Sequence, residues 1–215
     1  MHDIEKRFGL YGILTNPVKG YDYLAKLFVE YRIRLIQLRI KDRPVEEITK
    51  IAEQIRKITE GTRSLFIVND SPIVAKAVSA DGVHIGQGDQ PFHEVRSFLG
   101  KQAIIGLSTH SPAQATEACL LKPQYIGTGP VFPTPTKKIA DPAIGIDGMS
   151  LMVKCATVPA VAIGGIDLSN LRAVLETGAE NFCMVRQLTQ ANDPEAVVRE
   201  TIKIYSEFYP GIMGS

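Results

Sequence analysis

Short apolar runs alternate with amphipathic stretches from one end of the chain to the other. The runs are nearly continuous in apolar residues, which is typical of strands that are covered on both faces. Eight runs are predicted strands: Gly9 to Thr15, Leu35 to Arg39, Ser64 to Val68, Gly82 to Ile85, Ala103 to Leu107, Gln124 to Gly127, Ala160 to Ile163 and Asn181 to Val185.

The segments between these runs have helical patterns. From Pro44 to Thr59, apolar residues recur at spacings of three and four, which places an apolar stripe on one face of a helix. Capping residues predict further helix starts at Ser71-Pro72, Ser111-Pro112, Asp167-Leu168-Ser169 and Asp193-Pro194. Gly178 is expected to end the helix before the eighth strand.

Eight strand–helix repeats without a linker favour an α/β fold, the closed (β/α)8 TIM barrel. A flavodoxin-like open sheet is the alternative, although it normally needs only about five or six such units. No break in composition divides the chain, so we expect one domain over residues 1–215. The irregular stretch at about 129–145 is expected to be a flexible active-site loop.

The composition excludes several classes of partner. A formal net charge of +1 gives no general attraction to nucleic acid or to an anionic membrane, so bound anions require a local cluster of cations. The separated Cys119, Cys155 and Cys183 are expected to be small, buried, reduced thiols. Together with an N-terminus that lacks an apolar targeting stretch, they predict a cytoplasmic protein. The sequence leaves a homo-oligomer open.

Candidate chemistry gathers where the predicted strands end, which is where barrels of this kind place their active sites. Gln37 and Arg39 point to one side of strand two, and Lys41 follows in the loop, so the three could grip an anion or be surface charges. Asp70 and Asp89 follow neighbouring strands, and two such carboxylates suit Mg²⁺. Asp70 could instead cap the next helix. His84 and His93 are interpreted as structural or surface residues.

Two further segments could hold phosphate. The loop after strand six carries Thr134, Thr136 and Lys137 behind a proline-rich approach, or it is a solvated basic loop. Gly164-Gly165 ends strand seven, where paired glycines let backbone amides approach a phosphate. Two anionic substrates, one of them bound to Mg²⁺, are therefore predicted.

Six ordered motifs closely resemble those of the thiamin phosphate synthase family. They are Gln37-Leu38-Arg39-x-Lys41, Val68-Asn69-Asp70, Gly82-Val83-His84-Ile85-Gly86-Gln87-x-Asp89, Gly106-x-Ser108-x-His110, Gly129-Pro130-Val131-Phe132-Pro133-Thr134-x-Thr136-Lys137 and Val161-Ala162-Ile163-Gly164-Gly165-Ile166. The family condenses hydroxymethylpyrimidine pyrophosphate with hydroxyethylthiazole phosphate and releases pyrophosphate.

The resemblance implies a role for each matching position. Residues expected to hold the pyrimidine and its pyrophosphate are Gln37, Arg39, Lys41, Asn69 and Ser108, and Asp70 and Asp89 would ligate Mg²⁺. Thr134, Thr136 and Lys137 would engage the thiazole phosphate and the pyrophosphate, and Gly165 would offer a backbone amide. Catalysis would rest on Arg39, Lys41, Ser108 and Lys137, which stabilise the leaving anion.

The end of strand eight departs from the family pattern. Where members usually carry a serine, this chain has Val185 followed by Arg186. Val185 and Arg186 could contact the thiazole phosphate, or the larger arginine side chain could crowd the site.

Three other functions remain alternatives to the synthase. They are a thiazole tautomerase with His110 as its acid–base residue, a non-catalytic binder of thiamin phosphates, and an unrelated phosphosugar barrel enzyme.

Overall fold

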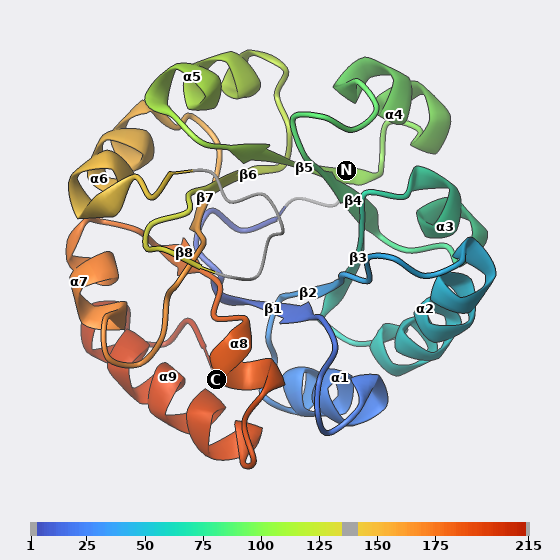
Figure 1. Ribbon diagram of the computed structural model, residues 1–215, viewed down its shortest axis with the longest axis horizontal. Helices are drawn as coiled ribbons and strands as arrows, with labels where there is room; N and C mark the ends of the chain where they lie inside the picture. Colours follow the sequence, from blue (N-terminus) through green and yellow to red (C-terminus); the bar gives the residue numbers. More distant parts are fainter. Residues whose placement is uncertain (1–3, 135–141, 214–215) are drawn as a thin grey trace.

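The computed structural model describes residues 4–134 and 142–213. Within them, parallel strands close into a barrel in chain order, and β8 pairs with β1 (Figure 1). The strands are β1 Gly9–Leu14, β2 Leu35–Leu38, β3 Leu65–Asn69, β4 Gly82–Ile85, β5 Ile104–Thr109, β6 Tyr125–Thr128, β7 Ala160–Ala162 and β8 Asn181–Phe182. The predicted TIM barrel is confirmed, and the closed strand order excludes the open-sheet alternative.

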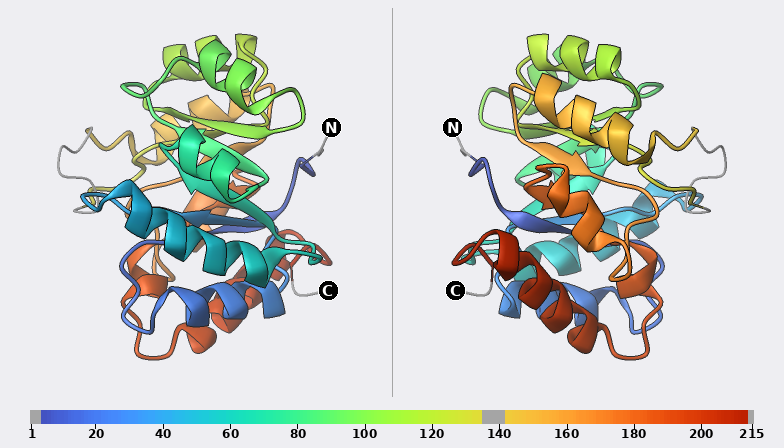
Figure 2. Two further views of the ribbon diagram at one scale, coloured as in Figure 1. Left: turned by 90° about the vertical axis from the view of Figure 1, so that its right-hand side faces the viewer. Right: turned by 90° about the vertical axis from the view of Figure 1, so that its left-hand side faces the viewer.

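Helices surround the barrel, as the two side views show (Figure 2). They are α1 Tyr21–Glu30, α2 Val45–Thr59, α3 Pro72–Ala77, α4 Phe92–Leu99, α5 Pro112–Leu120, α6 Gly145–Cys155, α7 Leu171–Glu176, α8 Arg186–Thr189 and α9 Pro194–Phe208. The short α8 lies inside the outer ring, next to the end of β8 (Figure 1). In the described residues, no helix combines the length and the apolar character needed to cross a bilayer.

The apolar residues form two layers because strand side chains alternate between the two faces of the sheet. Tyr11 and Ile13 of β1 point into the barrel and pack with Leu35 and Ile67. Leu10 and the other outward residues of the strands pack against the helices in a larger cluster. The barrel interior is therefore a packed core at one end, which leaves the opposite end for a cavity.

The capping predictions hold at three helices and fail at one. Side-chain oxygens of Ser71, Ser111 and Asp193 accept hydrogen bonds from backbone N–H groups in the first turns of α3, α5 and α9. Asp167 instead accepts from Ser169 in a turn, and α7 begins only at Leu171. In the turn before α7, the side chain of Gln187 accepts a hydrogen bond of 2.7 Å from the backbone N–H of Leu168.

The burial of the cysteines agrees with the prediction at two positions. Cys119 and Cys183 are buried, whereas Cys155 at the end of α6 is exposed, so the expectation of three buried thiols was wrong for that residue. Burial raises the pKa of the Cys183 thiol, which keeps it protonated.

Candidate active site

One cavity of about 680 Å³ opens at the carboxyl ends of the strands. Residues of the strand ends and of the loops that follow them form its wall, and side chains from inside the barrel form its floor. This is a volume suited to small-molecule ligands. Polar residues that lie far apart in the sequence can therefore face the same ligand.

All the predicted site residues that the structure describes line this cavity. They are Gln37, Arg39, Lys41, Asn69, Asp70, Asp89, Ser108, Thr134, Gly165, Val185 and Arg186. Thr136 and Lys137 lie outside the described residues. The strand-end positions converge because every strand of a parallel barrel delivers its carboxyl end to the same face.

The acidic pair lies on one side of the cavity. Lys41 forms an ion pair with Asp70, while one carboxylate oxygen of Asp89 accepts a hydrogen bond of 2.7 Å from the backbone N–H of Gly86. Partial desolvation and the neighbouring Asp70 carboxylate raise the pKa of Asp89, against the opposing effects of Gly86 and Lys41. Asp70 does not cap α3, because Ser71 does. The two carboxylates are therefore close enough to bind one cation together.

The chemistry of Asp70 and Asp89 suits Mg²⁺. The described residues contain no group of three or more His, Cys, Asp or Glu side chains that could hold a metal alone. Mg²⁺ is commonly held by one or two carboxylates, with water and substrate phosphate completing its octahedron. Asp70 and Asp89 beside an open cavity fit that ligand set.

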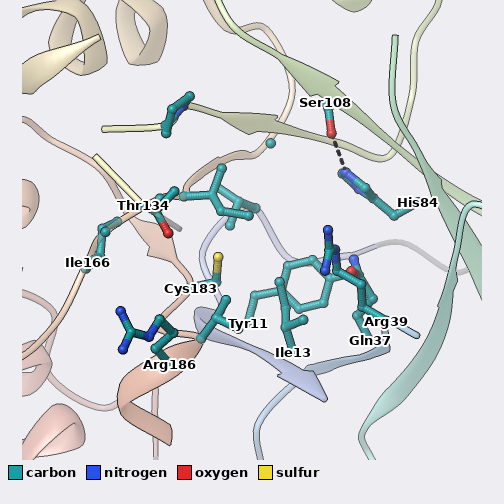
Figure 3. A pocket seen from close by; sticks show the side chains of 18 of the residues that line it. Tyr11, Ile13, Gln37, Arg39, His84, Ser108, Thr134, Ile166, Cys183 and Arg186 are labelled. Carbon is teal, nitrogen blue, oxygen red and sulfur yellow. Dashed lines mark hydrogen bonds between the residues drawn. The ribbon is translucent and has the colours of Figure 1, made fainter. Parts of the chain in front are cut away.

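Two arginines reach the cavity from opposite sides, Arg39 after β2 and Arg186 at the start of α8 (Figure 3). Neither guanidinium has a hydrogen-bond or ion-pair partner among the described residues. Cationic side chains that face a cavity without a partner are suited to anionic ligands. The site can therefore accept negative charge at two separate places.

The paired glycines after β7 permit a close approach by the loop after β6. Gly164 and Gly165 have φ angles of 100° and 65°. A Cβ atom on Gly164 would lie 2.4 Å from Pro130, and one on Gly165 would lie 2.7 Å from Phe132. Val131 donates a backbone hydrogen bond of 2.8 Å to Ile163. The glycines therefore shape the cavity wall at the expected phosphate position.

The sequence analysis missed part of the cavity floor. Tyr11, Tyr125 and His84 line it, and the His84 ring stacks on Tyr125 with centroids 5.5 Å apart. The interpretation of His84 as merely structural or at the surface was incomplete, whereas His93 is exposed, as expected. Inward alternation along the first and sixth predicted strands was the available signal for the two tyrosines.

His110 also lines the cavity, and its Nδ1 atom lies 2.6 Å from the backbone carbonyl oxygen of Gly129. Since a carbonyl oxygen only accepts, Nδ1 carries the proton in this contact. The ring is thereby tied to the loop that follows β6.

Curated proteins of known function are similar to this chain. A curated thiamine-phosphate synthase from Pelotomaculum thermopropionicum is 39% identical over 213 residues, covering 94% of this chain and 97% of its own length. One from Archaeoglobus fulgidus is 37% identical and covers 99% of this chain and 100% of its own. In these comparisons the similarity extends over nearly the whole chain.

Solved structures give the same result. Thiamine phosphate pyrophosphorylase from Pyrococcus furiosus has a TM-score of 0.84 and 34% identity, covering 94% of this chain and 97% of that one. A 3-hexulose-6-phosphate synthase at 15% identity and a TM-score of 0.62 shares the fold alone. The family model described as thiamine monophosphate synthase matches residues 20–188. The chain therefore belongs to the thiamine monophosphate synthase family.

Proposed function

We propose that this protein condenses hydroxymethylpyrimidine pyrophosphate with hydroxyethylthiazole phosphate to give thiamin phosphate and pyrophosphate. The observation that carries the proposal is the convergence of Gln37, Arg39, Asp70, Asp89 and Ser108 on one cavity. These residues come from motifs far apart in the sequence. Their assembly in one site fits a reaction in which a pyrophosphate must leave.

The pyrophosphate side of the cavity combines several charges. Arg39 and Lys41 would bind the anion, and Asp70 and Asp89 would hold Mg²⁺, which supplies further positive charge when bound. One cation about 4 Å from an anionic oxygen contributes roughly 4 kcal/mol at an effective dielectric near 20. Because negative charge on the leaving oxygen grows as the carbon–oxygen bond breaks, these interactions favour the transition state over the bound substrate.

The remaining roles concern the second substrate. Thr134, the backbone amide of Gly165 and the segment Val185–Arg186 would hold the thiazole phosphate. Thr136 and Lys137, which lie outside the described residues, would engage the thiazole phosphate and the pyrophosphate. The loop at about 129–145, which the sequence predicts to be flexible, includes residues 135–141, and these lie outside the described residues. The thiazole nitrogen then attacks the pyrimidine methylene carbon with its own lone pair, so the reaction requires no nucleophilic side chain.

The rival activities lack specific support. The cluster of Arg39, Lys41, Asp70 and Asp89 would have no task in a thiazole tautomerase, although His110 lies in the cavity wall. A non-catalytic binder would likewise need no pair of carboxylates beside the pyrophosphate position.

The test is incubation of the purified protein with both substrates and Mg²⁺, with thiamin phosphate detected by mass. We expect product that depends on both substrates and disappears with excess chelator. Full turnover in chelator would contradict the Mg²⁺ role. Absence of product would contradict the synthase activity, and isomerisation of a thiazole phosphate supplied alone would identify the tautomerase instead.

A further inference from the structure

A continuous chain of hydrogen bonds crosses the floor of the cavity. Gln37 Nε2 donates to the Tyr11 hydroxyl at 2.9 Å, and the Tyr11 and Tyr125 hydroxyls lie 2.7 Å apart. The Tyr125 hydroxyl lies 3.1 Å from His84 Nδ1. His84 Nε2 lies 2.9 Å from Ser108 Oγ, the contact dashed in Figure 3. The chain therefore joins two side chains that line the cavity, Gln37 and Ser108, through three residues beneath them.

The packing shows that the middle of this chain is built into the barrel. Tyr125 is 0% exposed and Tyr11 is 2% exposed, and their rings meet edge to face at 88°. Gly106 on β5 makes room for the Tyr125 phenol, since a Cβ there would lie 2.1 Å from the ring. A hydroxyl pair this deeply buried has little access to water and satisfies its hydrogen bonds mainly within the protein.

The order of donors follows from the end at Gln37. Its Nε2 group can only donate, so the Tyr11 hydroxyl accepts from Gln37 and donates a hydrogen bond to the Tyr125 hydroxyl. Tyr125 then donates to His84 Nδ1, and the ring proton of His84 resides on Nε2, facing Ser108. Ser108 Oγ accepts a hydrogen bond from this N–H group. Its own hydroxyl hydrogen is therefore left to point into the cavity.

The reverse order leaves a buried group unsatisfied. If Tyr125 donated to Tyr11, the Tyr11 oxygen would accept twice, and its proton would have no acceptor among the described residues. An unsatisfied buried donor is strongly unfavourable. With the Gln37 amide oriented so that Nε2 faces Tyr11, the hydrogen bonds select one direction of donation along the whole chain. A flipped amide, with Oε1 facing Tyr11, would reverse that direction.

We infer that Tyr11, Tyr125 and His84 are positioning residues, which fix Gln37 as an acceptor and Ser108 as a donor toward the ligand. Gln37 Nε2 is committed to Tyr11, so its Oε1 atom remains for the ligand. An aminopyrimidine offers the complementary pair, an amino donor beside a ring-nitrogen acceptor. This inference rests on the proposed function for the identity of the ligand, but the direction of the chain does not.

The direction is tested in the ligand-free protein by nitrogen-15 NMR of the histidine rings, with His84→Asn identifying the His84 signals. We expect the Nε2–H tautomer at His84 and a change in the Nδ1 shift in Tyr125→Phe, which removes the donor to that atom. The Nδ1–H tautomer in the wild-type protein would overturn the inference. This readout does not depend on turnover.

The positioning role is tested by calorimetric binding of hydroxymethylpyrimidine pyrophosphate with Mg²⁺. Tyr125→Phe should raise the Kd about tenfold, because the donor at Ser108 is no longer held in place. The KM for thiazole phosphate should stay unchanged. Tyr205→Phe is the matched control, since its buried hydroxyl donates to the Glu180 carbonyl at 2.8 Å, outside the cavity.

Three outcomes would overturn the positioning role: an unchanged Kd in Tyr125→Phe, equal weakening of both substrates, or the same weakening in Tyr205→Phe. Thermal unfolding of each variant shows whether it is folded. Normal pyrimidine binding without product would contradict the proposed synthase activity and leave the inference supported.

Discussion

Arg186 stands where the sequence resemblance predicts a serine, and its guanidinium lies in the cavity opposite Arg39 (Figure 3). Arg186→Ser should raise the KM for thiazole phosphate and leave that for the pyrimidine substrate unchanged. Charge-assisted hydrogen bonds contribute roughly 1.5–3 kcal/mol, which corresponds to about 10- to 100-fold in KM. Steady-state kinetics with each substrate varied in turn provides the measurement.

Arg172→Ser is the control for this prediction, because Arg172 pairs with Glu207 on the outer surface. Improved use of thiazole phosphate by Arg186→Ser would show that the arginine obstructs the site. Unchanged kinetics would show that it has no part in binding.

Single residues also show which parts of the site could be predicted from the sequence. Alternation along a strand was sufficient to place Gln37 and Arg39 on the side that faces the cavity. It was insufficient for His84, because the partners that define its surroundings, Tyr125 and Ser108, come from β6 and β5. A contact between distant strands leaves no local signal in the sequence.

At the scale of elements, the seam that closes the barrel depends on one side chain. β8 pairs with β1 over only two positions. Asn181 on β8 is buried, its Oδ1 atom accepts from the backbone N–H groups of Phe8 and Gly9 at 2.7 and 3.2 Å, and its Nδ2 atom donates to Lys6 and Ala160. The amide therefore supplies hydrogen bonds that the short strand cannot.

Asn181→Ala should destabilise the protein by about 3–5 kcal/mol, since several backbone groups lose their partner in a buried place. Chemical denaturation measures the free energy of unfolding. Asn192→Ala is the control at an exposed position and should change it by less than about 0.5 kcal/mol. Similar values for the two variants would show that the backbone ladder closes the seam without the amide.

The contact between Gly165 and the loop after β6 is a second feature at the scale of elements. Gly165 and Gly178 both have positive φ angles, 65° and 87°, but only Gly165 is crowded, by Phe132 and Pro133. Gly178→Ala should cost only the conformational strain, about 1–2 kcal/mol. Gly165→Ala should cost more and should also raise the KM for thiazole phosphate, because the loop after β6 must move.

Denaturation and kinetics on this pair separate strain from crowding. Equal losses of stability with unchanged KM values would contradict a role for Gly165 in shaping the site.

The late start of α7 is also an element-scale feature that the sequence did not predict. Asp167 and Ser169 have capping chemistry, but Asp167 accepts from Ser169 within a turn, and Leu168 binds the distant Gln187. Sequence patterns do not report such tertiary contacts.

For the whole molecule, the number and spacing of apolar runs predicted the barrel because each run is one strand buried on both faces. The same topology explains why the site residues could be grouped in advance: a parallel barrel brings all carboxyl strand ends to one face. The exposure of Cys155 was not predictable, since α6 also exposes the apolar Leu151, and which side of the helix faces solvent depends on how it packs.

Mg²⁺ bound at the site should raise the stability of the whole molecule. Asp70 and Asp89 repel each other in the metal-free protein, and a ligand that binds only the folded state stabilises it. At a free Mg²⁺ concentration 100 times its Kd, with inorganic pyrophosphate present, stabilisation should be about 2.7 kcal/mol and the Tm should rise by roughly 5–10 °C. Asp89→Asn should lose this shift, whereas Asp22→Asn, at an exposed position on α1, should keep it. Thermal unfolding in chelator, in Mg²⁺ and in Mg²⁺ with pyrophosphate decides the matter, and a full shift in Asp89→Asn would place the cation elsewhere.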